Sequence, residues 1–320
     1  MDRRQKILEH IRPGMRGIEI GPFFAPLLPK ADGWDVQVLD VYNAEQLRER
    51  AAADPGIAPA AIARIETVDL LGPAHRLAEL AGAAGHAPHS FDFVLSSHNF
   101  EHLPDPLRFL QAVQQVLKPG GVLSMVLPDK RFCFDMLRPR STLGEVLEAY
   151  FERREQPTLR QHFDMVVDFV TLAPAAPEEP SADDPLRNGA PHEILQEAFV
   201  DWVRALKAAS RPYSDVHCWT FTPTSAELLL RDLRFLDLID LDIASCSDTE
   251  GYEFLVHLRN APDAAPMTRD EHYPLRRQLF ARLAAEQDAF GERTAAGGPA
   301  GKLTAPGSPA SLAGHPTRRG

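Results

Sequence analysis

Short apolar runs alternate with longer segments of helical periodicity over residues 16–128, and this alternation constrains the fold more than any other feature. The runs are short and several are nearly apolar throughout, which is typical of strands covered on both faces. They lie at residues 17–20, 35–40, 64–70, 91–97 and 121–128. The segments between them predict helices at residues 43–53, 75–85 and 105–118. Repeated strand–helix–strand order predicts an α/β fold with a mostly parallel sheet and right-handed crossovers.

The order of elements changes after residue 128. Three helices are predicted, and a loop rich in Pro, Glu and Asp at residues 173–185 is expected to be mobile. A strand, a helix, an antiparallel pair of strands and a last helix follow. The predicted helices lie at 142–154, 158–171, 192–208, 224–233 and 269–289, and the strands at 216–223, 235–245 and 252–260. Residues 291–320, rich in Gly, Ala, Pro and Ser, are expected to be a disordered tail.

The composition excludes several classes of function. A net charge of −11 argues against nucleic acid or an anionic membrane as the main partner, because both attract clustered Lys and Arg. The cysteines Cys133, Cys218 and Cys246 lack CxxC spacing, which suits a reducing compartment. There is no apolar leader and no run near the roughly 18 apolar residues that cross a bilayer. We therefore expect a soluble cytoplasmic protein.

The stretch RGIEIGPFFAPLLPK begins as a nucleotide-binding loop would, with a strand that ends in a glycine, Gly21. The further glycines of a dinucleotide loop are missing, and Phe23 and Phe24 would crowd the path of a pyrophosphate. A ligand without phosphates needs only one glycine at this crossing, and S-adenosylmethionine fits that description. Glu19 would orient the loop amides or the ammonium group of this ligand, or would simply pair with the N–H groups of the loop.

Ligands of open α/β sheets bind beyond the carboxyl ends of the strands. Asp40 ends the second predicted strand, roughly 20 residues after the glycine loop, where a carboxylate can accept bonds from both ribose hydroxyls. The alternative is a capping or solvated aspartate. Asp69 ends the third predicted strand and could bond an adenine amino group, or cap the following helix. Ser97 and His98 follow the fourth strand in the same way.

Two stretches carry a family resemblance. GIEIGPFFAPLLPK is similar to a variant first motif, E-I-G-P-x-x-x-P-x-x-P-K, of bacterial class I S-adenosylmethionine-dependent methyltransferases. The longer stretch SFDFVLSSHNFEHLPDPLRFLQAVQQVLKPGGVLSMVLPD resembles the signature of the fourth strand, helix and fifth strand in the same class. The resemblance covers residues 14–130, and the strand pair at 235–260 is consistent with it.

The resemblance implies a Rossmann-like seven-stranded sheet in the order 3-2-1-4-5-7-6, with the last strand antiparallel and a helical insertion after the fifth strand. We expect one methyltransferase domain over residues 1–290, divided into a cofactor half (14–130), a helical insertion or acceptor region (131–215) and closing strands and helices (216–290). The resemblance also implies S-adenosylmethionine as the cofactor. The residues that would contact it are Glu19 and Gly21 at the methionine, Asp40 at the ribose, Asp69 at adenine, and Ser97 and His98 at the sulfonium.

Methyl transfer to oxygen usually needs a base, for which histidine is the natural candidate near neutral pH. His98 and His217 are the catalytic candidates, and His162 is a further histidine in the predicted insertion. Glu101 and His102 are interpreted as fixing the loop and capping the next helix. The i, i+3, i+4 spacing of His98, Glu101 and His102 could also converge on an ion, but no second cluster completes the shell, so we expect no metal.

The cationic residues after the fifth strand, Lys130 and Arg131, could attract an anionic acceptor or be solvated; Arg138 and Arg140 are similar.

The function predicted is O-methylation of a small-molecule or sugar-containing acceptor. One alternative is a catalytically inactive, methyltransferase-like module with a cofactor-binding or regulatory role. Another is a nicotinamide-dependent oxidoreductase. The sequence specifies neither the acceptor nor the oligomeric state.

Overall fold

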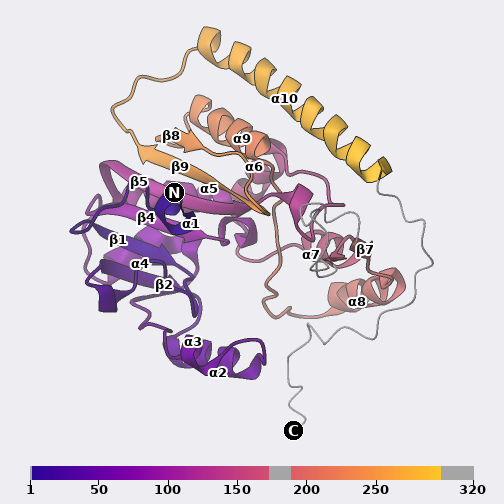
Figure 1. The fold of residues 1–320 in the computed structure, drawn as a ribbon, viewed down its shortest axis with the longest axis horizontal. Helices are drawn as coiled ribbons and strands as arrows, with labels where there is room; N and C mark the ends of the chain where they lie inside the picture. Colours follow the sequence, from indigo (N-terminus) through magenta and orange to yellow (C-terminus); the bar gives the residue numbers. More distant parts are fainter. Residues whose placement is uncertain (1, 173–188, 297–320) are drawn as a thin grey trace.

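The computed structural model describes residues 2–172 and 189–296. Its centre is a seven-stranded sheet in the order β3-β2-β1-β4-β5-β9-β8 (Figure 1). The strands from β3 to β5 run parallel, whereas β9 is antiparallel to both of its neighbours. This is the predicted order 3-2-1-4-5-7-6, so the predicted Rossmann-like fold is confirmed. The strands are β1 Arg16–Ile20, β2 Asp35–Asp40, β3 Leu70–Leu71, β4 Phe91–Ser97, β5 Leu117–Pro128, β8 Leu241–Cys246 and β9 Glu253–Asn260.

Helices cover both faces of the sheet. The larger core joins one face to α4, α5, α6 and α9, while the other face packs on α1 and the loop that follows β1. α2 and α3 enclose a third, smaller cluster beyond the sheet edge. The helices are α1 Arg3–Ile7, α2 Ala44–Ala53, α3 Pro59–Ile62, α4 Leu77–Ala83, α5 Pro106–Val116, α6 Leu143–Phe151, α7 Leu159–Val167, α8 Leu195–Lys207, α9 Pro223–Phe235 and α10 Arg269–Ala296.

The sequence of α5 shows why these helices form where they do. Asp105 caps the N-terminus by accepting a bond from the Arg108 N–H at 3.0 Å, and Pro106 takes the first helical position. Apolar residues of this helix, including Leu107 and Leu110, are buried against the sheet. The helix therefore fixes the turn that follows β4, where the functional residues gather.

The insertion after β5 holds α6, α7 and α8, together with a small antiparallel pair, β6 Val170–Leu172 and β7 Gly189–Pro191, that the sequence did not predict. Figure 1 shows α7, α8 and β7 gathered at one side of the molecule, away from the first five strands of the sheet. The loop predicted to be mobile, residues 173–185, lies outside the described residues.

Several predicted elements differ from the structure. The third strand, predicted at residues 64–70, consists only of Leu70–Leu71 (β3), so Asp69 precedes this strand rather than ending it. Residues 216–223 form no strand; Phe221 makes an isolated bridge to Asp129. β8 begins at Leu241, because α9 extends to Phe235 and is followed by a turn. α10 continues to Ala296, into the predicted tail, and residues 297–320 lie outside the described part.

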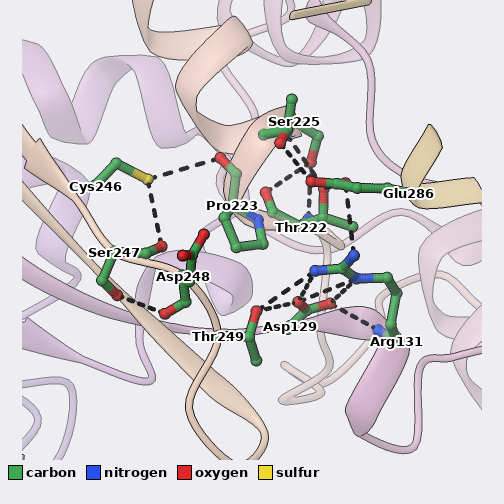
Figure 2. Close-up of polar contacts among 11 residues, drawn as sticks. Asp129, Arg131, Thr222, Pro223, Ser225, Cys246, Ser247, Asp248, Thr249 and Glu286 are labelled. Atoms are coloured by element: carbon green, nitrogen blue, oxygen red, sulfur yellow. Dashed lines mark hydrogen bonds and ion pairs between the residues drawn. The ribbon is translucent and has the colours of Figure 1, made fainter. Parts of the chain in front are cut away.

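A polar network ties the end of β5 to α9 and α10 (Figure 2). Arg131 pairs with the buried Asp129, which also accepts a bond from Thr249. Glu286 of α10 accepts bonds from Thr222 and Thr224 at the start of α9. The network joins the two closing helices to the strand end from which the insertion begins.

Among the described residues, no helix combines the length and the apolar character that crossing a membrane requires.

Candidate functional site

The loop after β1 is organised by Glu19. Its buried carboxylate accepts bonds from the Leu27 N–H at 2.8 Å and the Leu28 N–H at 3.2 Å. Burial raises the pKa of Glu19 to about 7, although these two hydrogen bonds act to lower it. Glu19 therefore holds the loop from beneath, as one of the two predicted interpretations requires.

The loop turns at Gly21, whose φ of +59° favours glycine and whose N–H donates to the Leu39 carbonyl at 2.8 Å. Phe23 and Phe24 meet edge to face, with ring centroids 4.9 Å apart, and pack on the cluster of α2 and α3. The rings lie among these side chains and are not part of the wall of the strand-end cavity described next. Residues 21–34 hold one 3-10 turn, Lys30–Asp32, and no α-helix opens at the glycine as a pyrophosphate site requires.

A cavity of about 180 Å³ lies at the carboxyl ends of β1, β2 and β4; we call it the strand-end cavity. Gly21, Asp40 and His98 line it, as their positions at the ends of these strands predict. Asp40 is nearly buried, and its Oδ1 accepts a bond from the Tyr42 N–H at 2.9 Å. Burial raises the pKa of Asp40. A carboxylate has about four acceptor positions, so Asp40 keeps the capacity to bind both hydroxyls of a ribose.

Like Glu19, two further residues predicted to contact the cofactor, Asp69 and Ser97, do not line the strand-end cavity. The Asp69 carboxylate accepts a bond from the Val38 N–H at 2.8 Å and pairs with Lys30 at 2.5 Å. It braces the start of β3, so the geometry does not support a contact with adenine. Ser97 pairs in register with Val126 at the end of β4 and stops short of the cavity wall.

His98 lies in the strand-end cavity with a φ of +49°. Its Nε2 is 2.8 Å from Glu253 on β9, and its Nδ1 is 3.5 Å from Glu101. Burial acts to lower the pKa of His98, but the Glu101 and Glu253 carboxylates outweigh it and raise the pKa to about 9. Both ring nitrogens face carboxylates, so His98 offers a cation to the cavity rather than a free base.

A second cavity, of about 570 Å³, lies among α7, α8 and residues 211–215; we call it the insertion cavity. Its wall combines aromatic rings with charges of both signs: Phe163, Trp202, Arg50, Arg211, Asp201 and Asp215. Tyr42, Tyr213 and Asp215 line both cavities, so the two spaces adjoin. The predicted acceptor region thus supplies much of a cavity beside the strand ends, and His162 is part of its wall.

His217 lines neither cavity. Its Nδ1 is 2.5 Å from Asp135, which also pairs with Arg138 at 2.6 Å. Burial acts to raise the pKa of Asp135, but these two partners lower it overall. The His217 ring stands edge to face on His102, with centroids 4.5 Å apart.

The cations after β5 are used within the chain. Arg131 pairs with Asp129, and Lys130 Nζ donates to the Met136 carbonyl at 2.8 Å. The two residues do not line the strand-end cavity or the insertion cavity, and their contacts do not favour the predicted attraction of an anionic acceptor.

Sequence reasoning missed the residues that join the two cavities. Tyr213 and Asp215 lie in an irregular segment with no periodic pattern, and Tyr42 follows the Asp40 turn. His102, interpreted as a capping residue, lines the strand-end cavity, and its Nδ1 is 2.9 Å from Asp215. The SSHNFEH motif marked this turn, but nothing in the sequence connected it to Asp215.

The sheet order and a single-glycine strand-end site define a Rossmann-like protein suited to a nucleoside ligand without phosphates. A protein-family model described as a methyltransferase domain matches residues 1–233. The chain therefore belongs to the methyltransferase domain family, and its assignment to the class I S-adenosylmethionine-dependent methyltransferases is confirmed. No curated protein matches the chain.

Several solved structures are similar to it. An S-adenosylmethionine-dependent methyltransferase of Methanosarcina mazei is 17% identical, with a TM-score of 0.40, and the match covers 82% of this chain and 99% of that one. A protein of the same description from Aquifex aeolicus is 13% identical, with a TM-score of 0.37, and the match covers 81% of this chain and 90% of that one. One from Mesorhizobium loti is 15% identical, with a TM-score of 0.39, and the match covers 80% of this chain and 97% of that one. With TM-scores this low, the similarities add no argument about the acceptor.

The chain thus is an S-adenosylmethionine-dependent methyltransferase, and the residues at the strand-end cavity suit that cofactor. A glycine turn with no α-helix after it, a buried carboxylate with free acceptor capacity and apolar residues such as Ala74 and Leu103 meet the needs of a nucleoside with a methionine tail. The nicotinamide alternative loses its basis, since the described loop lacks the helix end that a pyrophosphate requires.

Proposed function

We propose that the protein transfers the methyl group of S-adenosylmethionine to an oxygen of a small-molecule or sugar-containing acceptor held in the insertion cavity. The observation that carries this proposal is the adjoining pair of cavities, which share Tyr42, Tyr213 and Asp215. Aromatic rings interleaved with Arg and Asp side chains can stack on the face of a sugar or ring compound while binding its hydroxyls. Much of the barrier to such a displacement can be lowered by positioning the two reactants.

Within the strand-end cavity, we assign Asp40 to the ribose, and Gly21 with the loop held by Glu19 to the methionine part. His98 is assigned as a cofactor contact. We do not retain it as the base, because its nitrogens face Glu253 and Glu101. His217 is not retained as a base either, since it lines neither cavity and its Nδ1 is paired with Asp135.

The cofactor assignment is tested by titrating the full chain with S-adenosylhomocysteine in a calorimeter. Asp40→Ala should weaken binding about 10- to 100-fold, the effect of losing hydrogen bonds to a charged group. Asp69→Ala is the matched control, because that carboxylate lies outside the strand-end cavity, and it should keep the wild-type affinity. NAD should not bind. A wild-type protein that fails to bind S-adenosylhomocysteine would contradict the assignment.

The acceptor is tested with isotopically methyl-labelled S-adenosylmethionine and a panel of hydroxyl-bearing ring compounds and sugars. We expect a labelled methyl group on an oxygen of at least one of them, located by mass spectrometry. Labelling on nitrogen or carbon alone would overturn the choice of atom. Cofactor binding without any product across the panel would favour the inactive, regulatory module instead.

A further inference from the structure

Glu101 is fully buried, and it lies in the turn Phe100–His102 just past the end of β4. Neither of its carboxylate oxygens has a hydrogen-bond partner. Two histidine nitrogens approach its Oε1, Nδ1 of His98 at 3.5 Å and Nε2 of His102 at 3.9 Å. A buried carboxylate without hydrogen bonds is costly, so the site calls for a group that can satisfy it.

The fold brings two histidines to this carboxylate. His102 is the next residue along the turn, and His217 comes from the irregular segment before α9. The Glu101 carbonyl accepts bonds from the Cys218 N–H at 2.7 Å and the Trp219 N–H at 3.1 Å, which fasten this segment to the turn. One ligand atom from each of Glu101, His102 and His217 can be chosen so that all lie within 4.8 Å of one another.

Each of these histidines also has a second carboxylate beside its Nδ1, hydrogen-bonded in His217 and within ion-pair distance in His102. Nδ1 of His217 is 2.5 Å from Asp135, and Nδ1 of His102 is 2.9 Å from Asp215. The nitrogen left for an ion is therefore Nε2 in both rings. A carboxylate on the far nitrogen is the usual companion of a metal-binding histidine, since it fixes the ring and makes the free nitrogen a better ligand.

We propose that Glu101, His102 and His217 form a binding site for one divalent transition-metal ion of the Zn²⁺ type. Two imidazoles and one carboxylate suit Zn²⁺ and its neighbours, whereas Mg²⁺ prefers oxygen ligands alone. In a tetrahedral site with bonds of about 2.1 Å, ligand atoms lie roughly 3.4 Å apart, so the three side chains need shifts on the order of 1 Å to close on the ion.

The proposal replaces our expectation of no metal, which rested on the lack of a second cluster in the sequence. His217 is the missing ligand, and its separation along the chain hid it. Of the three ligands, His102 lines the strand-end cavity, so a bound ion would border the space assigned to the cofactor. A three-ligand site also keeps a position for a solvent or acceptor oxygen.

The test uses the tag-free full chain, stripped with chelator and then equilibrated separately with Zn²⁺, Co²⁺ or Mg²⁺. We expect one equivalent of Zn²⁺ by elemental analysis, visible absorption of bound Co²⁺ typical of a low-coordinate nitrogen and oxygen site, and no retained Mg²⁺. Glu101→Gln and His217→Asn should each lower the Zn²⁺ content to below about a tenth of an equivalent. His86→Asn, a histidine away from the cluster, is the matched control and should keep one equivalent.

Because Glu101 and His217 are buried, their variants could fail to fold, so circular dichroism and thermal melting accompany each measurement. His102→Asn changes a more exposed ligand and should lose the ion while keeping the fold. Asp135→Asn should weaken Zn²⁺ binding about 10- to 100-fold, as loss of a carboxylate behind a ligand does. Absence of saturable Zn²⁺ or Co²⁺ binding to the wild type, or equal binding by folded His102→Asn, would overturn the proposal. The first result would leave the turn as a cluster of carboxylates and histidines that balance one another without an ion.

Discussion

Glu19 lies one residue before the end of β1 and Asp40 ends the neighbouring strand β2, yet the two carboxylates meet different partners. The Glu19 carboxylate accepts hydrogen bonds from two backbone N–H groups of the loop that follows it, whereas Asp40 lines the strand-end cavity. Both are buried, and burial raises the pKa of each. The first residue therefore shapes the loop, and the second is left to bind.

The pKa of Glu19 predicts a pH dependence of stability. Its folded-state pKa of about 7 lies above the ordinary value of 4.5, so the unfolded chain releases this proton more readily. The stabilising contribution of protonated Glu19 to the folded state is fully present below pH 4.5 and is lost as the pH rises through 7. The free energy of unfolding should fall by about 3 kcal/mol over this range. Denaturant unfolding of the cofactor-free protein at pH 5 and pH 8 measures it. Glu19→Gln should lack this loss, and the exposed Glu45→Gln should retain it; equal pH dependence in all three proteins would refute the assignment.

At the scale of elements, α10 is joined to α9 through Glu286. Its carboxylate accepts bonds from Thr222 and Thr224 at the N-terminus of α9, where a negative charge is also favourable to the helix dipole (Figure 2). Further contacts link Arg276 of α10 to Asp232 of α9 at 3.0 Å. α10 is thus fixed by polar contacts as well as by apolar packing.

Glu286→Ala should lower the unfolding free energy by about 1 to 3 kcal/mol, because it leaves two hydroxyl groups without acceptors. Thermal melting of the cofactor-free protein measures the change. Asp288→Ala, an exposed carboxylate on the same helix, should melt within about a degree of the wild type. If the two variants melted alike, the network would have no role in docking α10.

Elements with a strong local pattern were predictable, and those set by tertiary contacts were not. β4 matches its predicted range because Phe93, Val94 and Leu95 form a short buried apolar run that leads to a polar turn. The run at 216–223 also carries buried apolar residues, but its N–H groups bond to the Glu101 carbonyl and to the Ser141 hydroxyl rather than to a neighbouring strand. Gly21 and Asp40 followed from strand-end spacing, whereas Tyr213 and Asp215 depend on how the insertion folds back.

At the scale of the whole molecule, the two cavities are built by different parts of the chain. The strand ends form most of the first, and the insertion with residues 211–215 forms most of the second. Only a narrow set of shared residues connects them within the described structure. Changes in one cavity should therefore leave binding in the other largely intact.

Trp202 tests this separation. It lies in the insertion cavity edge to face with Phe163, with ring centroids 4.8 Å apart. Trp202→Ala should raise the KM for an acceptor found in the panel at least about tenfold, through lost aromatic contact, without changing the affinity for S-adenosylhomocysteine. Phe199→Ala, an exposed ring on the same helix, should leave both values unchanged. A parallel loss of cofactor affinity in Trp202→Ala would show that the two sites are coupled.

The loop after β1 has a consequence for selection among the ligands of a cell. ATP and other phosphorylated adenine nucleotides present the same ribose as the methyl donor, so the ribose contact that we propose for Asp40 would not distinguish them from it. A helix beginning at Gly21 would attract their phosphates. The loop after Gly21 instead forms no α-helix and only the later 3-10 turn Lys30–Asp32, and its N–H groups bond to the Glu19 carboxylate. Competing nucleotides are thus disfavoured because no helix N-terminus binds their phosphates, not because they are sterically excluded. A short helix engineered to begin at Gly21 should therefore increase their affinity.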